Sequence, residues 1–192
     1  MLAMSRNDAD QRGAVAGGDN VGRDKIDNSR QYRYEYRRTQ IEIWMEKLSE
    51  ELKGDVRVQT MIDGLQYYHK KHSEDGVEGL ENKLDHAQRS HQKFKALSKK
   101  ELFAKELERL SYYRSAQEIF AYFLSKVDSY FETEVMPHID NLSCDQIDYL
   151  VRTKVVEPVL SEAGGDAFLL NYNHVLGMVY WLAEQCFIRW HK

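Results

Sequence analysis

The chain has 192 residues, of which 42% are hydrophobic and 30% are charged, and its formal net charge at pH 7 is −4. This length suits one domain with a core of its own, and the composition is typical of a soluble, helical globular protein. The negative net charge argues against a protein whose whole surface attracts nucleic acid. Two cysteines, in a chain that begins without an apolar signal-peptide core, indicate free thiols and a cytoplasmic location.

Residues 1–30 are predicted to be a flexible N-terminal arm. They are polar, contain glycines and have few large apolar side chains, so they cannot bury enough surface to offset the entropy of ordering. Within the arm, Gly17-Gly-Asp-Asn-Val-Gly22 has glycines that could turn backbone amides toward a phosphate. The standard nucleotide fingerprints require a Gly-Lys-Ser/Thr or a preceding strand, and neither is present. We interpret the segment as a turn-rich linker.

Residues 31–192 are predicted to form a single all-α domain of about six to eight helices, because apolar residues recur there at helical spacing. The first long helix should end at Gly54, a natural left-handed stop, and Asp55 should cap the second. A third, amphipathic helix is expected around Leu80 and Leu84. The apolar face of the first helix comprises Ile41, Trp44, Met45, Leu48 and Leu52.

A basic helix is predicted over residues 90–110. It carries five lysines, whose charge is diluted by the acids Glu101, Glu106 and Glu108. With the arginines near the start of the domain, these lysines could meet the phosphates of a nucleic acid, which leaves a nucleic-acid-binding helical subunit as an alternative function. The basic residues are Arg33, Arg37, Arg38, Lys93, Lys95, Lys99, Lys100 and Lys105.

An aromatic helix that starts at Ser111 is expected to lie at the centre of the core, since aromatic stripes at helical spacing are normally buried. Ser143 and Gln146 form a capping box that starts the next helix. Pro158 should stop or kink that helix, and Asn171 or Asn173 should cap the last one. The aromatic helix carries Tyr113, Ala116, Ile119, Phe120, Phe123, Leu124, Val127 and Phe131.

No set of residues indicates catalysis, a cofactor or a metal. Cys186 lies between His174 and His191 in sequence, but a histidine twelve positions upstream on a helix should be about 18 Å away. His69 and His72 supply only two ligands, whereas zinc takes three or four from the protein. We predict that the chain is not an enzyme.

The C-terminal run over residues 174–190 is the most apolar part of the chain. Val175, Leu176, Val179 and Leu182 fit a helix that is apolar around most of its circumference, which means burial. The run is too short and too interrupted to cross a bilayer, which needs about 20 apolar residues. It must dock inside the domain or against a partner.

The same run carries a family resemblance. Gly177-Met-Val-Tyr-Trp-Leu182, followed by Cys186 and Ile188-Arg-Trp190, resembles the end of the C-terminal domains of bacterial ABC-three-component conflict systems. Phe187 stands where those domains often have histidine. The resemblance covers residues 32–190 and includes Leu65-Gln-Tyr-Tyr68, Gly79-Leu-Glu-Asn-Lys-Leu84, Lys100-Glu-Leu-Phe-Ala-Lys105 and Ala116-Gln-Glu-Ile119.

The resemblance implies a non-catalytic adaptor in an antiphage defence complex, which links an effector to an ABC-type ATPase and a middle component. It implies that any contact with nucleic acid is made through the complex. A homo-oligomer is an alternative that the sequence leaves open. The family domain usually follows an effector module, whereas this chain has only the arm. The hypothesis is that partners bind a C-terminal surface; burial of the same residues in the core is the alternative. That surface comprises Met178, Trp181, Phe187, Ile188, Arg189 and Trp190.

Overall fold

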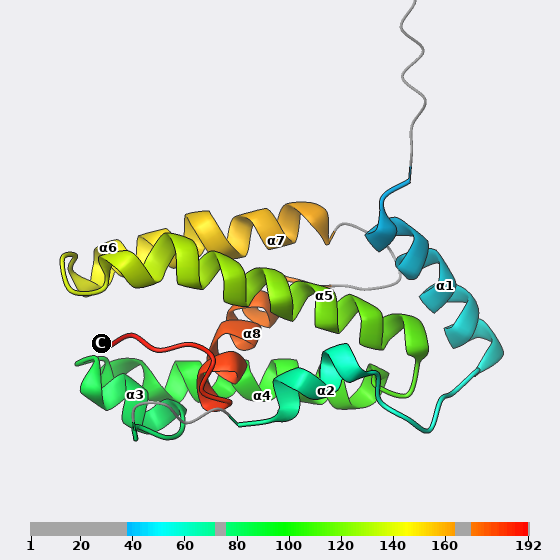
Figure 1. The fold of residues 1–192 in the computed structure, drawn as a ribbon, viewed down its shortest axis with the longest axis horizontal. Helices are drawn as coiled ribbons and strands as arrows, with labels where there is room; N and C mark the ends of the chain where they lie inside the picture. The colour runs from blue at the N-terminus through cyan, green and yellow to red at the C-terminus, as the bar shows by residue number, and fades with distance from the viewer. Residues whose placement is uncertain (1–37, 72–75, 164–169, 192) are drawn as a thin grey trace, which may run out of the picture. The chain divides into compact units, whose positions relative to one another are not determined.

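The computed structural model describes residues 38–71, 76–163 and 170–191, and in these ranges every regular element is a helix (Figure 1). The predicted all-α class is therefore confirmed. The expected N-terminal arm, Arg33, Arg37 and His72 lie outside the described residues. No helix in the described part of the chain is long and apolar enough to cross a membrane.

Short 3-10 or π-helical segments lie between several of the principal α-helices. The α-helices are α1 (Gln40–Gly54), α2 (Asp63–His69), α3 (Leu80–His86), α4 (Lys93–Leu110), α5 (Arg114–Tyr130), α6 (Cys144–Leu150), α7 (Glu157–Glu162) and α8 (Tyr172–Glu184). Short 3-10 segments are η1 (Ser90–Gln92) and η3 (Met136–His138), and π-helical segments are η2 (Phe131–Val135) and η4 (Val151–Val156). Because η4 joins α6 to α7 without a break, these three elements form one continuous helix (Figure 1).

Helix α1 ends at Gly54 as predicted, but the left-handed residue is the one after it. The helix includes Gly54, and Asp55 is the left-handed residue that follows it, with φ 48°. Asp55 does not cap α2, which begins only at Asp63 after an extended link. Its carboxylate instead accepts hydrogen bonds from Arg57 Nε at 2.7 Å and from the Tyr113 hydroxyl at 3.0 Å. Those bonds tie the end of α1 to the start of α5.

Pro158 does not stop the helix. A proline lacks an N–H, and its ring clashes with the carbonyl four residues earlier, which in this chain belongs to Lys154. The π-helical segment η4 ends at Val156, immediately before α7, and its wider turn accommodates this mismatch. The predicted capping box of Ser143 at the start of α6 is confirmed, and of the two asparagines predicted as caps of the last helix, Asn171 caps α8.

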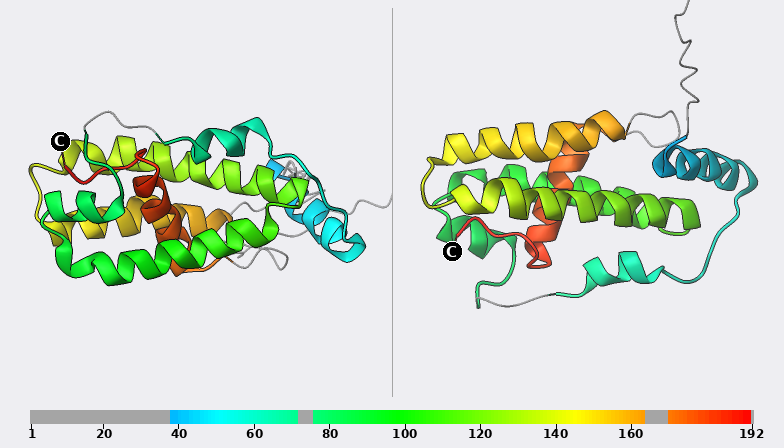
Figure 2. Two further views of the ribbon diagram at one scale, coloured as in Figure 1. Left: turned by 90° about the horizontal axis from the view of Figure 1, so that it is seen from below. Right: turned by 45° about the horizontal axis from the view of Figure 1, so that its top comes forward.

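The core is built around α5 and α8, as expected. Helix α5 contacts α1 and α2, and α8 crosses both α4 and α5 (Figure 2). On α5 the buried face includes Phe120, Phe123 and Val127; on α8 it includes Val175, Val179 and Leu182. All six side chains are fully enclosed, which explains why α8 is apolar around most of its circumference.

Gly177 allows the crossing of α8 and α4. A Cβ atom at this position would lie 2.4 Å from the carbonyl oxygen of Lys99 and 2.7 Å from Cβ of Phe103. Real Cβ atoms do not approach other atoms this closely, so only glycine fits here without a shift of the backbone. The crossing fixes the position of the middle of α4 relative to α8.

The tail after α8 folds back onto the domain. Cys186 adopts φ 68°, which turns the chain, and Ile188 and Trp190 are then buried at 1% and 6% exposure. The buried Lys83 donates a hydrogen bond from Nζ to the carbonyl oxygen of Ile188 at 3.0 Å. The Trp190 ring packs edge-on against Phe131, with the ring centroids 5.7 Å apart. The tail is therefore part of the core.

Candidate functional site

The C-terminal surface predicted from the sequence is largely absent. Met178, Trp181, Ile188 and Trp190 are at most 6% exposed, because α8 and the tail fill the interior of the domain. Phe187 is half-buried against the rings of Tyr67 and Tyr68, at centroid distances of 5.3 and 5.0 Å. Arg189 is also half-buried. Four of the six residues are therefore buried in this structure, and the other two are partly covered.

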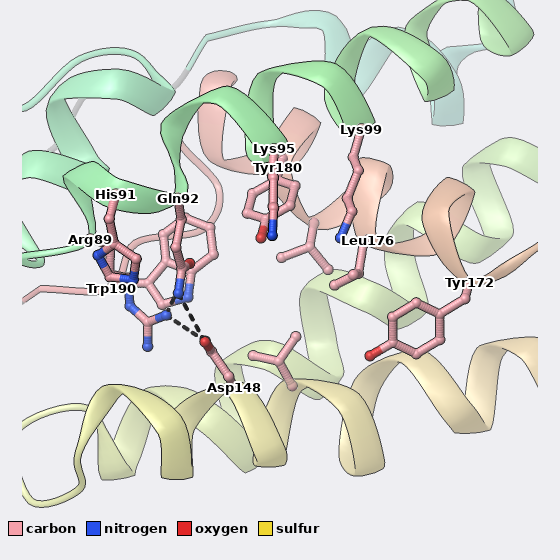
Figure 3. A pocket seen from close by; sticks show the side chains of 12 residues that line it. Arg89, His91, Gln92, Lys95, Lys99, Asp148, Tyr172, Leu176, Tyr180 and Trp190 are labelled. Carbon is pink, nitrogen blue, oxygen red and sulfur yellow. Dashed lines mark hydrogen bonds and ion pairs between the residues drawn. The ribbon is translucent and has the colours of Figure 1, made fainter.

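A cleft of about 430 Å³ opens between the start of α4, the continuous helix α6–η4, and α8 (Figure 3). Helix α4 supplies basic side chains from one side, α6 supplies an acid from the other, and α8 supplies tyrosines and aliphatic groups between them. We call it the basic cleft. It is lined by Arg89, His91, Gln92, Lys95, Lys99, Asp148, Val151, Tyr172, Leu176, Val179, Tyr180 and Trp190.

Arg89 forms a fixed wall at one end of the basic cleft. Its side chain is only 3% exposed and makes an ion pair with Asp148. It also donates to the Cys144 carbonyl oxygen at 3.0 Å and to Gln92 Oε1 at 3.3 Å. Gln92 Nε2 donates to the second oxygen of Asp148 at 3.0 Å. The Arg89 charge is thereby compensated, and the network ties η1 to α6.

Lys95 and Lys99 supply positive charge that is not compensated in this way. Both extend from α4 toward the cleft (Figure 3), and neither has a hydrogen bond or an ion pair with any residue that the structure describes. Burial, together with the neighbouring charge of Lys95, lowers the pKa of Lys99 below its usual value. An anion between the two ammonium groups would relieve this unfavourable arrangement.

The remaining walls of the basic cleft combine phenols with aliphatic groups. Burial raises the pKa of Tyr180 to about 12, so its hydroxyl stays protonated at neutral pH and can donate a hydrogen bond. Tyr172 points into the cleft from the first turn of α8 (Figure 3), and its pKa is also raised by burial. Leu176, Val179 and Val151 supply apolar surface. The arrangement suits an anion that is attached to an apolar body.

A shallower groove of about 320 Å³ lies beside the cleft and shares Lys95 and Lys99 with it. Phe94 is 82% exposed there, and Leu102, two turns further along α4, is 40% exposed. We call it the α4 groove. It is lined by Phe94, Lys95, Ser98, Lys99, Leu102 and Asn173.

The position of Phe94 in the sequence of α4 contains a signal against its burial. The buried face of α4 includes Phe103, Leu107 and Leu110. Phe94 is nine positions before Phe103, and at about 100° per residue this places it on the opposite side of the helix. Its exposure could therefore have been predicted.

Among the residues that the structure describes, several of the predicted basic side chains lie beside acids. Lys93 makes an ion pair with Asp85, and Lys100 lies 3.9 Å from Glu184. Arg38 makes an ion pair with Glu46 on α1. Only Lys95 and Lys99 are brought together at a hollow.

The histidine and cysteine candidates are separated by the length of α8. His174 lies in its first turn, where the Nδ1 atom accepts a hydrogen bond from the Asn171 amide at 3.3 Å, whereas Cys186 follows its end. Within the described ranges, no three His, Cys, Asp or Glu side chains are grouped so that they could hold a metal ion.

The chain was compared with known proteins. The family model for C-terminal domain 9 of the ABC-three component (ABC-3C) systems matches residues 79–190, which include all the residues of the basic cleft and the α4 groove. The match begins later than the expected range of 32–190. Comparisons with curated proteins and with solved structures gave no significant match. Since the family model covers more than half of the sequence, the chain belongs to the family of C-terminal domain 9 of the ABC-three component systems.

Proposed function

We propose that this chain is a non-catalytic adaptor of an ABC-three component antiphage system, in which it links an effector to the ABC-type ATPase and the middle component. Family membership supports this proposal, because it implies that the chain works with the other components of such a system. We assign no bond-making step to the chain itself.

The exposure of Phe94 is the observation that carries the proposal. A phenylalanine side chain that is 82% exposed leaves most of its apolar surface in water, and its full burial against a partner would contribute about 1.5–3 kcal/mol. Exposed aromatic side chains beside a hollow are typical anchors of protein–protein interfaces. Phe94 and Leu102 lie on the outer side of α4, so a partner can cover them without any change in the core.

Charge indicates the chemistry of the partner. Lys95 and Lys99 lie between the two apolar residues in the sequence of α4, and neither makes a salt bridge with a described acidic residue, although Asp148 attracts Lys99 at longer range. A complementary segment would present apolar side chains to Phe94 and Leu102 and carboxylates to the two lysines. We therefore propose that an acidic, apolar segment of the ATPase or of the middle component occupies the α4 groove.

The test is co-purification of the full chain with its co-expressed ATPase and middle component. Phe94→Ala and Leu102→Ala should each reduce recovery of the complex, while the helical circular-dichroism signal stays unchanged because both side chains are outside the core. Tyr112→Ala is the matched control, since this aromatic residue is 51% exposed just beyond the far end of α4. Equal recovery with Phe94→Ala and Tyr112→Ala would reject the α4 groove as the docking site.

A further inference from the structure

The basic cleft contains an excess of positive charge at a fixed place. Of its cationic side chains, Arg89 makes an ion pair with Asp148, the one carboxylate among the described residues that line the cleft. With Lys95 and Lys99, the cationic side chains therefore outnumber this carboxylate by two, although Asp148 also attracts Lys99 at longer range. A ligand that carries two negative charges on one small group would balance them.

A phosphate monoester has this charge. Its second pKa is about 6, so at neutral pH it carries between about −1.5 and −2 and offers three strong acceptor oxygens. A carboxylate carries only one charge and two oxygens. Two ammonium groups and the Tyr180 hydroxyl are all hydrogen-bond donors, which matches the three acceptors of a terminal phosphate.

The other side of the cleft favours an organic group on that phosphate. Leu176, Val179 and Val151 supply an apolar wall, and the Tyr172 ring points toward it from the first turn of α8 (Figure 3). The volume of about 430 Å³ exceeds the needs of an inorganic ion and falls within the range of roughly 300–1,000 Å³ found for small-molecule sites. Asp148 can accept a hydrogen bond from a donor on the organic part.

The cleft is also preorganised. The close crossing at Gly177 holds the backbone of Lys99, and the network of Arg89, Gln92 and Asp148 holds the opposite end. A ligand would therefore have to order few side chains when it binds, which lowers the entropic cost.

We propose that the basic cleft binds a small organic monophosphate, with its phosphate between Lys95, Lys99 and the Tyr180 hydroxyl and a flat organic group against Leu176 and Tyr172. The apolar wall of this site belongs to α8 and η4 rather than to Phe94 and Leu102, but its two lysines also line the α4 groove, so a bound phosphate and the partner's carboxylates would compete for them. The two hollows share only the two lysines.

The test is calorimetric titration of the purified full chain with phenyl phosphate. Phenyl phosphate should bind more tightly than inorganic phosphate, which lacks the ring, and more tightly than benzoate, which has one charge fewer. Phenol, which has the ring but no anionic group, should show no measurable binding. A folded chain that gives no heat with phenyl phosphate, or that binds benzoate equally well, would overturn the proposal.

Matched variants locate the site. Lys95→Gln and Lys99→Gln should each lower the affinity for phenyl phosphate by about tenfold, as expected for the loss of one charge-assisted hydrogen bond. Lys105→Gln, which removes an exposed lysine of α4 outside both hollows, should leave the affinity unchanged. Equal weakening by Lys105→Gln would indicate nonspecific attraction and reject the site.

The experiment separates this proposal from the adaptor role. Phe94→Ala should leave phenyl phosphate binding intact even where it removes co-purification, because Phe94 does not line the basic cleft. Loss of ligand binding in Phe94→Ala, with the fold retained, would contradict the assignment of the two hollows to separate functions.

Discussion

Gly177 of α8 lies directly against the backbone of Lys99 on α4, so that an added Cβ atom would come within 2.4 Å of the Lys99 carbonyl oxygen. One glycine thus sets the packing of the two helices that supply half of the residues lining the basic cleft. This accounts for the glycine at the start of the Gly177-Met-Val-Tyr-Trp-Leu182 segment in physical terms.

Gly177→Ala should lower the free energy of unfolding by about 1–3 kcal/mol or more, because the neighbouring atoms are backbone and cannot move aside. Gly64→Ala in α2 is the matched control. Its Cβ would meet only Cβ of Ala121 at 3.6 Å, an ordinary contact, and the better helix propensity of alanine should stabilise it by up to about 1 kcal/mol. Urea unfolding measures both. Equal stability of Gly177→Ala and the unmodified chain would contradict the close crossing.

Ile188→Ala should destabilise the domain by about 2–5 kcal/mol, because it deletes a side chain that is only 1% exposed and leaves a cavity in the core. Ile43→Ala on α1 serves as the comparison. Ile43 is half-exposed, so its substitution should lower the free energy of unfolding much less. Thermal unfolding followed by circular dichroism distinguishes the two variants. A small effect at Ile188 would show that the tail can leave the domain, which would restore it as a candidate binding surface.

Asp148→Asn should destabilise the domain by about 1–3 kcal/mol, because the buried Arg89 guanidinium loses its charged acceptor. The carboxylate is 45% exposed, so water compensates part of the loss and the effect stays below that of a fully buried pair. Asp145→Asn, an exposed acid one turn earlier on α6, should change stability little. Chemical denaturation compares the two, and an equal effect at both positions would argue against a structural role of the Arg89 network.

Glu162 at the end of α7 should make the free energy of unfolding depend on pH in the acidic range. Burial alone would raise its pKa, but hydrogen bonds from Lys126 and Tyr122 outweigh this and hold the pKa below the usual 4.5. A carboxyl whose folded-state pKa is lowered contributes stability above its unfolded pKa and loses that contribution as pH falls through the folded value.

Glu162→Gln should therefore reduce the stability difference between pH 7 and acid pH, while it leaves stability at the most acidic pH nearly unchanged. Unfolding midpoints from pH 7 down to about 2 measure this, since the contribution is lost as the carboxyl is protonated. The exposed Glu132 provides the control variant Glu132→Gln. An acid profile of Glu162→Gln that is identical to that of the unmodified chain would contradict the role of this carboxyl.

Patterns that depend on local chemistry predicted much of the fold. The apolar spacing of α5 and the Ser143 and Asn171 caps are short-range features, and the structure confirms them. For Pro158 two outcomes were predicted, a stop or a kink, and the structure excludes the stop, because a π-helical segment that leaves no short-range signature precedes the proline.

The candidate site could not be predicted to the same extent. Arg89 and Asp148 are 59 positions apart, and only the folding of η1 onto α6 makes them a pair. The apolar C-terminal run was equally consistent with a core and with an interface. Its composition indicates that the side chains are buried, but not whether the same domain or a partner covers them. Phe94 is the exception, since its position opposite the buried face of α4 could be deduced from helix geometry.

The most direct test of the adaptor role is the equilibrium dissociation constant between the full chain and its ATPase or middle component, measured for Phe94→Ala beside Tyr112→Ala. Loss of a central aromatic anchor should weaken binding by about tenfold or more, whereas Tyr112→Ala should match the unmodified chain. Identical dissociation constants for the two variants, or no measurable binding of the unmodified chain to either component, would contradict the account.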